Sequence, residues 1–246
     1  MNLTATIFDP ANARECAAAS AEAYSSRPTV SCLETDTQAI VLEAANYVVV
    51  AFRGTSNVRD FVTDARFFRS LLLEQANGDR CEVHTGFLAA YESIIADLTA
   101  HLREIVVMNR PVFVTGHSLG GALAILAALE LKRQRFNIAQ VYTFGQPRVG
   151  NKAFAVMYNA ALKDSTFALV NEGDPVPLLP PLLNGYRDCG TEIFLRKSGG
   201  TLIDPFIGFE LFVDIMGAIQ SWRNYRLGLL PNHFLNAYRQ RTQLLA

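Results

Sequence analysis

The sequence predicts an α/β fold in which a mainly parallel central sheet carries helices on both faces. Apolar strand-like runs alternate with longer helical runs rich in Ala and Leu, which is the pattern of a parallel sheet. A strand, a tight turn and a helix also follow one another directly around residues 116–121. Because the chain has 246 residues, of which 50% are hydrophobic, it can bury a substantial core, and we expect one domain over residues 1–246.

The periodicity of apolar residues gives the expected elements in order. Helices are expected over residues 10–24, 88–107, 122–135 and 152–162, and strands over 39–43, 46–52, 112–115, 139–144, 166–170 and 192–195. Residues 71–79 are expected to form a loop, because Asn77-Gly78 is a turn signal. Residues 205–230 are rich in large apolar side chains, which leaves two interpretations open: a helix packed on the sheet, or a flap that contacts lipid.

Residues 116–121 read Gly-His-Ser-Leu-Gly-Gly and place a serine at the apex of the tight turn. This is the G-x-S-x-G pattern of a nucleophile elbow, in the strand-turn-helix context that the pattern requires. Gly116 and Gly120 avoid collisions that a larger side chain would make with neighbouring backbone. The turn is expected to lift the Ser118 hydroxyl toward substrate, and the first amides of the following helix point to the same place.

A serine hydroxyl needs a base, and the four histidines allow a choice by elimination. His117 is adjacent to Ser118 and cannot fold back onto its hydroxyl, while His84 and His101 precede the elbow. In α/β-hydrolases the catalytic residues follow the chain order Ser, then Asp or Glu, then His. His233 is therefore predicted to be the base.

Asp174 is the best-placed acid to orient that imidazole. It follows the strand-like residues 166–170 and precedes Pro175, so it lies on a loop at the carboxyl end of a strand. Open α/β sheets place their ligand-handling groups there. The weaker candidates are Asp164, Asp188, Asp204, Asp214 and Glu172.

The oxyanion that forms during acyl transfer needs hydrogen-bond donors already in place. The amide of Leu119, directly after the serine, is one such donor. Thr55 follows the strand at 46–52 in the loop Arg53-Gly54-Thr55 and can offer both its amide and its hydroxyl. We therefore predict Thr55 and Leu119 as the oxyanion hole.

With these motifs the chain resembles the class 3 lipases, the family of the filamentous-fungal triacylglycerol lipases and their bacterial relatives. Four ordered segments carry the resemblance: residues 52–55, 83–87, 116–121, and 171–177 with 180–181. It implies the α/β-hydrolase fold, Ser118, Asp174 and His233 as the triad, and Thr55 and Leu119 as the oxyanion hole. It also implies that His84 is a structural or site-supporting residue.

The family carries a short helical lid after the oxyanion loop, which corresponds here to residues 56–64. Val58, Phe61 and Val62 fall on one face of a helix in this segment. Two interpretations stay open: a lid that opens at a lipid surface, or an ordinary surface helix packed on the core.

These features predict a serine carboxylic-ester hydrolase, most simply a triacylglycerol lipase that forms an acyl-enzyme on Ser118. An esterase or a phospholipase A1-type enzyme is the alternative, because pocket shape and not the triad selects the substrate. A non-catalytic lipid- or partner-binding protein is disfavoured because all three predicted triad residues are present. The expected partner is an ester lipid, with transient contact to a lipid interface, and the chemistry requires no metal or cofactor.

Composition narrows the remaining classes of function. A net charge of -1 provides no basic field for nucleic acid, and no run of the ~18 apolar residues of a membrane-spanning helix occurs. The first residues lack the features of a signal peptide, so either the protein is cytoplasmic or a leader lies outside this sequence. Cys16, Cys32, Cys81 and Cys189 match no metal motif and are expected to be free thiols, with a Cys16–Cys32 bridge conceivable.

Overall fold

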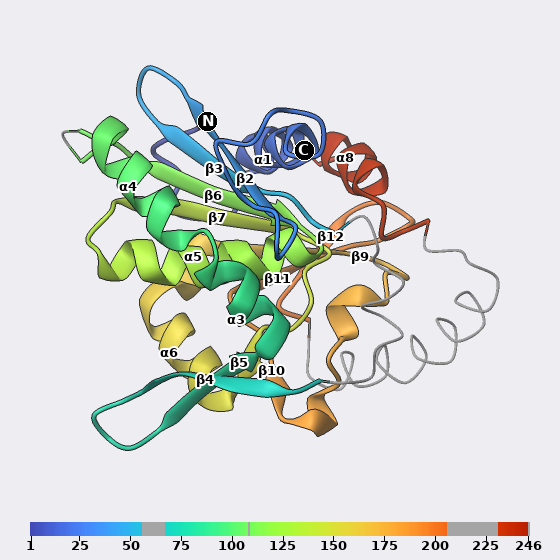
Figure 1. Cartoon of the computed structure of the whole chain (residues 1–246). Coiled ribbons are helices and arrows are strands. Elements are labelled where there is room, and N and C mark those ends of the chain that lie inside the picture. Colours follow the sequence, from blue (N-terminus) through green and yellow to red (C-terminus); the bar gives the residue numbers. More distant parts are fainter. Residues whose placement is uncertain (56–66, 108, 206–230, 246) are drawn as a thin grey trace.

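The computed structural model describes residues 1–55, 67–107, 109–205 and 231–245 (Figure 1). In them, eight strands form one sheet in the order β1-β2-β3-β6-β7-β9-β11-β12. The central strands are parallel: β3 (Val48–Phe52), β6 (Val112–His117), β7 (Ile138–Phe144), β9 (Thr166–Asn171) and β11 (Thr191–Leu195). Antiparallel strands complete the two edges: β1 (Val30–Cys32), β2 (Thr37–Glu43) and β12 (Thr201–Ile203).

Helices cover both faces of this sheet, as the sequence predicted (Figure 1). On one face lie α1 (Pro10–Glu22) and α8 (Leu235–Gln243), and on the other α3 (Thr85–Glu92), α4 (Ile95–Ile105), α5 (Leu119–Arg133) and α6 (Lys152–Leu162). β6 is buried along its whole length, because helices cover it on both sides. A strand that is covered on both faces does not alternate between apolar and polar residues, and β6 begins with three consecutive apolar residues, Val112 to Val114.

A second, smaller sheet is antiparallel, with the strand order β10-β8-β5-β4. It contains β4 (Arg69–Glu74), β5 (Arg80–His84), β8 (Gly150–Asn151) and β10 (Tyr186–Arg187). The prediction of a loop over residues 71–79 was therefore wrong for its first half, although the turn at Gly78 was placed correctly. β4 is only half-buried, and its pairing shifts register between Leu71 and Leu73, so the period of two that marks a strand is absent.

The single helix predicted over residues 88–107 is two helices, α3 and α4. The Ser93 hydroxyl, at the C-cap of α3, lies 2.8 Å from the Ala90 carbonyl and 2.8 Å from the Thr35 hydroxyl. Such side-chain bonds to nearby backbone compete with helix propagation. Short 3-10 turns at Lys163–Ser165 (η1), Val176–Leu178 (η2) and Leu182–Asn184 (η3) complete the described elements.

The predicted lid and most of the apolar segment fall in residues that the structure does not describe, whereas the cysteines can be compared with it directly. Val58, Phe61 and Val62 of the predicted lid, and residues 206–230, lie outside the described residues. None of the helices in the described ranges combines the length and hydrophobicity that a membrane crossing requires. All four cysteines are free thiols, so the conceivable Cys16–Cys32 bridge is not formed.

Candidate active site

The predicted site residues converge at one edge of the large sheet. Because β3, β6 and β9 run parallel, their carboxyl ends meet at the same edge. Thr55 follows β3, Ser118 follows β6, and Asp174 follows β9 after a turn closed by its own amide on the Asn171 carbonyl at 2.9 Å. His233 lies two residues before α8 and reaches the same edge through its contacts with Ser118 and Asp174.

Ser118 occupies a strained backbone conformation at the apex of the elbow. Its φ is 58° and its ψ is -128°, a region that costs a non-glycine residue about 1–3 kcal/mol. The flanking glycines permit the turn, as predicted: a Cβ on Gly116 would lie 2.1 Å from the Gly120 carbonyl oxygen, and one on Gly120 would lie 2.3 Å from that of Phe52. Ser118 is the N-cap residue of α5, so it lies at the end of the helix where the first backbone amides have no preceding turn of helix to bond to.

Ser118, His233 and Asp174 form one continuous series of hydrogen bonds. His233 Nε2 lies 2.9 Å from Ser118 Oγ, and His233 Nδ1 lies 2.9 Å and 3.1 Å from the two carboxylate oxygens of Asp174. A carboxylate only accepts, so Nδ1 carries the proton and Nε2 is free to accept the serine proton. All three residues are at most 4% exposed. The geometry is that of a Ser-His-Asp triad.

Asp174 is held by two further donors that sequence analysis did not find. Tyr238 of α8 donates its hydroxyl to Oδ2 at 2.6 Å, and the Val176 amide donates to Oδ1 at 2.9 Å. Burial, and then the nearby Asp174 charge, raise the pKa of Tyr238 well above its usual value, so the phenol stays a donor. The only sequence signal for Tyr238 is a large aromatic residue in a mostly polar helix.

The loop between β7 and β8, residues 145–149, packs directly on the Asp174–His233 pair. Gly145 has a φ of 58°, and a Cβ there would lie 2.7 Å from Asp174 Oδ2 and 3.0 Å from His233 Nδ1. Arg148, 4% exposed, pairs with Asp188 at 2.9 Å and donates to the Leu178 carbonyl at 2.7 Å. Gly145 therefore leaves room for the Asp174 carboxylate. Arg148 holds the backbone at Leu178 and the side chain of Asp188 in place.

The other candidate acids lie elsewhere. Asp188 faces Arg148, and Asp204 pairs with Lys163 at 3.1 Å. Glu172 accepts the Lys197 amide at 2.7 Å. Asp164 is exposed in η1, and Asp214 lies outside the described residues. Only Asp174, among the candidates that are described, is in contact with His233.

The two predicted oxyanion donors come from neighbouring segments. Leu119 is the first residue of α5, and Thr55 follows Gly54 after β3. A Cβ on Gly120 would lie 2.3 Å from the Phe52 carbonyl oxygen and 2.9 Å from the Arg53 carbonyl carbon, so the start of α5 lies directly against the end of β3. His84, which the resemblance suggested as a supporting residue, caps α3 by accepting the Gly86 amide at 3.2 Å.

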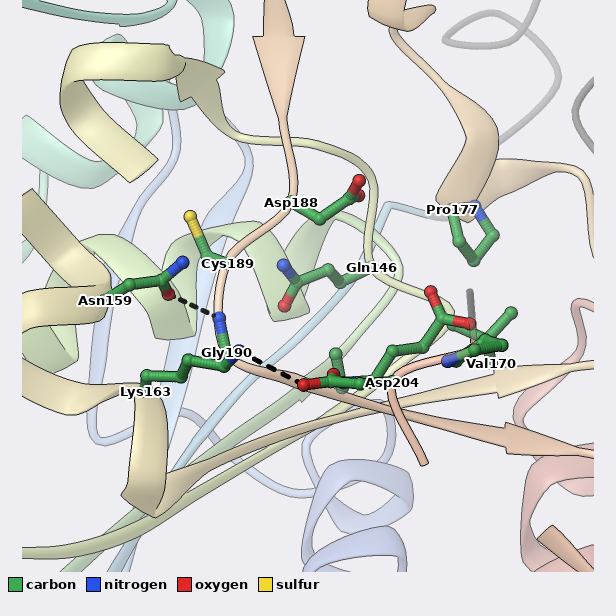
Figure 2. Close-up of a pocket in the computed structure, with 12 residues that line it drawn as sticks. Gln146, Asn159, Lys163, Val170, Pro177, Asp188, Cys189, Gly190 and Asp204 are labelled. Atoms are coloured by element: carbon green, nitrogen blue, oxygen red, sulfur yellow. Dashed lines mark hydrogen bonds and ion pairs between the residues drawn. The ribbon is translucent and has the colours of Figure 1, made fainter. Parts of the chain in front are cut away.

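A cavity of about 360 Å³, lined by both polar and apolar residues, lies beside the loop that carries Asp174 but does not contain the triad (Figure 2). Gln146 and Pro177, which adjoin Gly145 and the Asp174 loop, form part of its lining. The Lys163–Asp204 ion pair lies on another side of the cavity, as Figure 2 shows. Ser118, Thr55 and His233 are not among the described residues that line it, so we do not assign the acyl chain to this cavity.

His117 is buried beside the triad instead of facing solvent. Its exposed fraction is 4%, its ring lies 4.8 Å from that of His233, and its Nε2 lies 2.6 Å from the His233 carbonyl oxygen. Burial, and then the nearby His233, lower the pKa of His117 to about 3 from its usual 6.5. The ring is therefore neutral in the folded protein at neutral pH.

This lowered pKa predicts a loss of stability in acid. Between about pH 3 and pH 6.5 the unfolded chain binds a proton at His117 that the folded chain excludes, so acid favours unfolding. Replacing His117 with glutamine removes this proton, and the free energy of unfolding should then depend less steeply on pH, by up to about 1.4 kcal/mol per pH unit. Urea unfolding at several values between about pH 4 and pH 6.5 gives the slope of the free energy of unfolding against pH for the wild type and for the variant. Equal slopes in the two proteins would contradict a neutral buried His117.

Comparison with known proteins agrees with this architecture. The family model described as Lipase (class 3) matches residues 49–184, more than half of the chain. A secreted mono- and diacylglycerol lipase of Fusarium solani is 40% identical over 173 residues, which cover 69% of this chain and 50% of that protein. A lipase of Rhizomucor miehei is 35% identical over 178 residues, covering 69% of this chain and 48% of that protein.

Solved structures extend the similarity to the fold. The crystal structure of a lipase from Rhizopus microsporus var. chinensis superposes with a TM-score of 0.69 at 28% identity, covering 80% of this chain and 79% of that one. The fold is thus the α/β-hydrolase fold, and the chain belongs to the class 3 lipase family. It spans about half the length of the Fusarium and Rhizomucor proteins that it matches in sequence.

Proposed function

We propose that this chain hydrolyses carboxylic esters of acylglycerols through an acyl-enzyme on Ser118, as a triacylglycerol lipase. The observation that carries the proposal is the buried hydrogen-bond series from Ser118 through His233 to Asp174 at a nucleophile elbow. Relatives named as mono- and diacylglycerol lipases and as a triacylglyceride lipase support the substrate class.

The chemistry follows from the atoms in place. The Ser118 oxygen attacks the ester carbonyl carbon while His233 Nε2 takes the hydroxyl proton, and Asp174 stabilises the imidazolium that forms. Leu119 and Thr55 donate hydrogen bonds to the carbonyl oxygen as it becomes an oxyanion. The C–O bond to the alcohol then breaks, and the alcohol leaves with the proton from His233. Water then takes the place of the alcohol: its oxygen attacks the acyl carbon while His233 Nε2 takes its proton. The bond to the Ser118 oxygen breaks, the serine regains a proton from His233, and the carboxylic acid is released.

The initial rate of tributyrin hydrolysis, measured from below to above its solubility limit, tests the proposal, with Ser118→Ala as the blank. We expect a serine-dependent rate that rises when droplets appear. A serine-dependent rate that saturates before droplets form would identify an esterase that acts on dissolved substrate. The absence of any serine-dependent rate would contradict ester hydrolysis and would favour a binding role.

A further inference from the structure

Tyr24 connects the segment of the predicted oxyanion donor to the histidine beside the nucleophile. It lies two residues after the end of α1, and its hydroxyl lies 2.9 Å from His117 Nδ1. The same hydroxyl packs closely against Gly54, the residue next to Thr55. Space there is tight, because a Cβ on Gly54 would lie 2.3 Å from the Tyr24 oxygen and 2.6 Å from the His117 carbonyl oxygen.

The direction of each hydrogen bond follows from chemistry. The His233 carbonyl can only accept, so His117 Nε2 carries the proton and donates it over 2.6 Å. In the neutral ring Nδ1 is then an acceptor, which the Tyr24 hydroxyl satisfies as donor. Burial raises the pKa of Tyr24 to about 12, so the hydroxyl keeps its proton at neutral pH and can donate it to His117 Nδ1.

We propose that Tyr24 and His117 are positioning residues that hold the oxyanion loop and the backbone of His233 in a fixed relation. The three connected segments are far apart in sequence, since 93 residues separate Tyr24 from His117 and 116 separate His117 from His233. Thr55 and His233 must act on one carbonyl group, and a displacement of ~1 Å can cost ~100-fold in rate. This inference rests on the proposed ester hydrolysis.

A purely stabilising role is the competing explanation, and a matched variant separates the two. Tyr158 of α6 is also a buried tyrosine, and its hydroxyl lies 2.9 Å from that of Thr166. It packs on the opposite face of the sheet from α1 and contacts none of the proposed catalytic residues through this bond. Tyr158→Phe and Tyr24→Phe therefore each remove one buried hydroxyl, but only Tyr24→Phe removes the hydrogen bond to His117.

The first test measures kcat, KM and Tm of both variants with p-nitrophenyl butyrate, a soluble ester. We expect Tyr24→Phe to lower kcat about 10-fold while KM changes less than about 2-fold, because geometry and not binding is affected. Tyr158→Phe should lower Tm and leave kcat unchanged. Equal losses of Tm with unchanged kcat in both variants would overturn the positioning role.

The second test separates the two hydrogen bonds of the His117 ring, one with the Tyr24 hydroxyl and one with the His233 carbonyl. The glutamine amide of His117→Gln reaches the position of Nε2 and can still donate to the His233 carbonyl, whereas His117→Asn reaches only the position of Nδ1. We expect His117→Gln to keep a higher kcat than His117→Asn, and Tyr24→Phe to cost less in a His117→Asn background than alone. Independent, additive losses would overturn the proposal. A wild-type chain without Ser118-dependent turnover would overturn the proposed function itself, whatever the variants do.

Discussion

Replacing Ser118 with alanine is expected to lower kcat for ester hydrolysis by about a million-fold, which is the scale measured for serine proteases. The small remaining rate would come from substrate binding and the oxyanion hole alone. Without the oxygen 2.9 Å from His233 Nε2, no acyl-enzyme can form. Alanine should also relieve none of the backbone strain, because the φ of 58° remains unfavourable for any residue with a Cβ. Stability should therefore change little.

The measurement is the rate of p-nitrophenyl butyrate hydrolysis by purified wild type and variant, with Tm recorded for both. Ser31→Ala is a suitable control, because Ser31 is exposed on the edge strand β1, away from the site. It should retain the wild-type kcat. A Ser118→Ala variant with more than about a tenth of the wild-type rate would contradict covalent catalysis at this serine.

Asp174→Asn is expected to lower kcat about 10⁴-fold while leaving KM nearly unchanged, by analogy with the same substitution in a serine protease. Asp174 accepts from His233, from Tyr238 and from the Val176 amide. An asparagine side chain has only one accepting oxygen, so its NH₂ group must face a donor or force His233 into the wrong tautomer. The imidazole then cannot accept the serine proton through Nε2.

The control for this variant is Asp97→Asn, in the first turn of α4, where the carboxylate is exposed. Both variants lose one negative charge, but only Asp174→Asn removes the partner of the imidazole. Single-turnover measurements with p-nitrophenyl butyrate report the acylation step directly. Acylation that slows less than about 10-fold in Asp174→Asn would show that another group orients His233.

The site residues that could be predicted are those that local sequence determines. The elbow is a continuous stretch in which a buried strand, two glycines and a helix all depend on near neighbours. His233 was predicted from chain order, and Asp174 from its place on a loop at the carboxyl end of a strand. The fold brings both residues to Ser118.

The parts that could not be predicted depend on which distant segments pack together. Tyr238 reaches Asp174 across 64 residues only because α8 docks beside α1, and nothing near Tyr238 indicates that contact. His117 was considered only as a base, since its burial beside His233 is a property of the assembled sheet. Strands of two or three residues, such as β8 and β10, are too short for periodicity to reveal them.

The central claim is that Ser118 is an activated nucleophile, and covalent labelling tests it most directly. The wild-type chain is incubated with diethyl p-nitrophenyl phosphate, and its intact mass and peptide map are compared with those of Ser118→Ala. We predict one diethylphosphoryl group per wild-type chain, carried by the peptide that contains Ser118, and none on the variant. A wild-type chain that stays unlabelled, or that is labelled on another residue, would contradict the account.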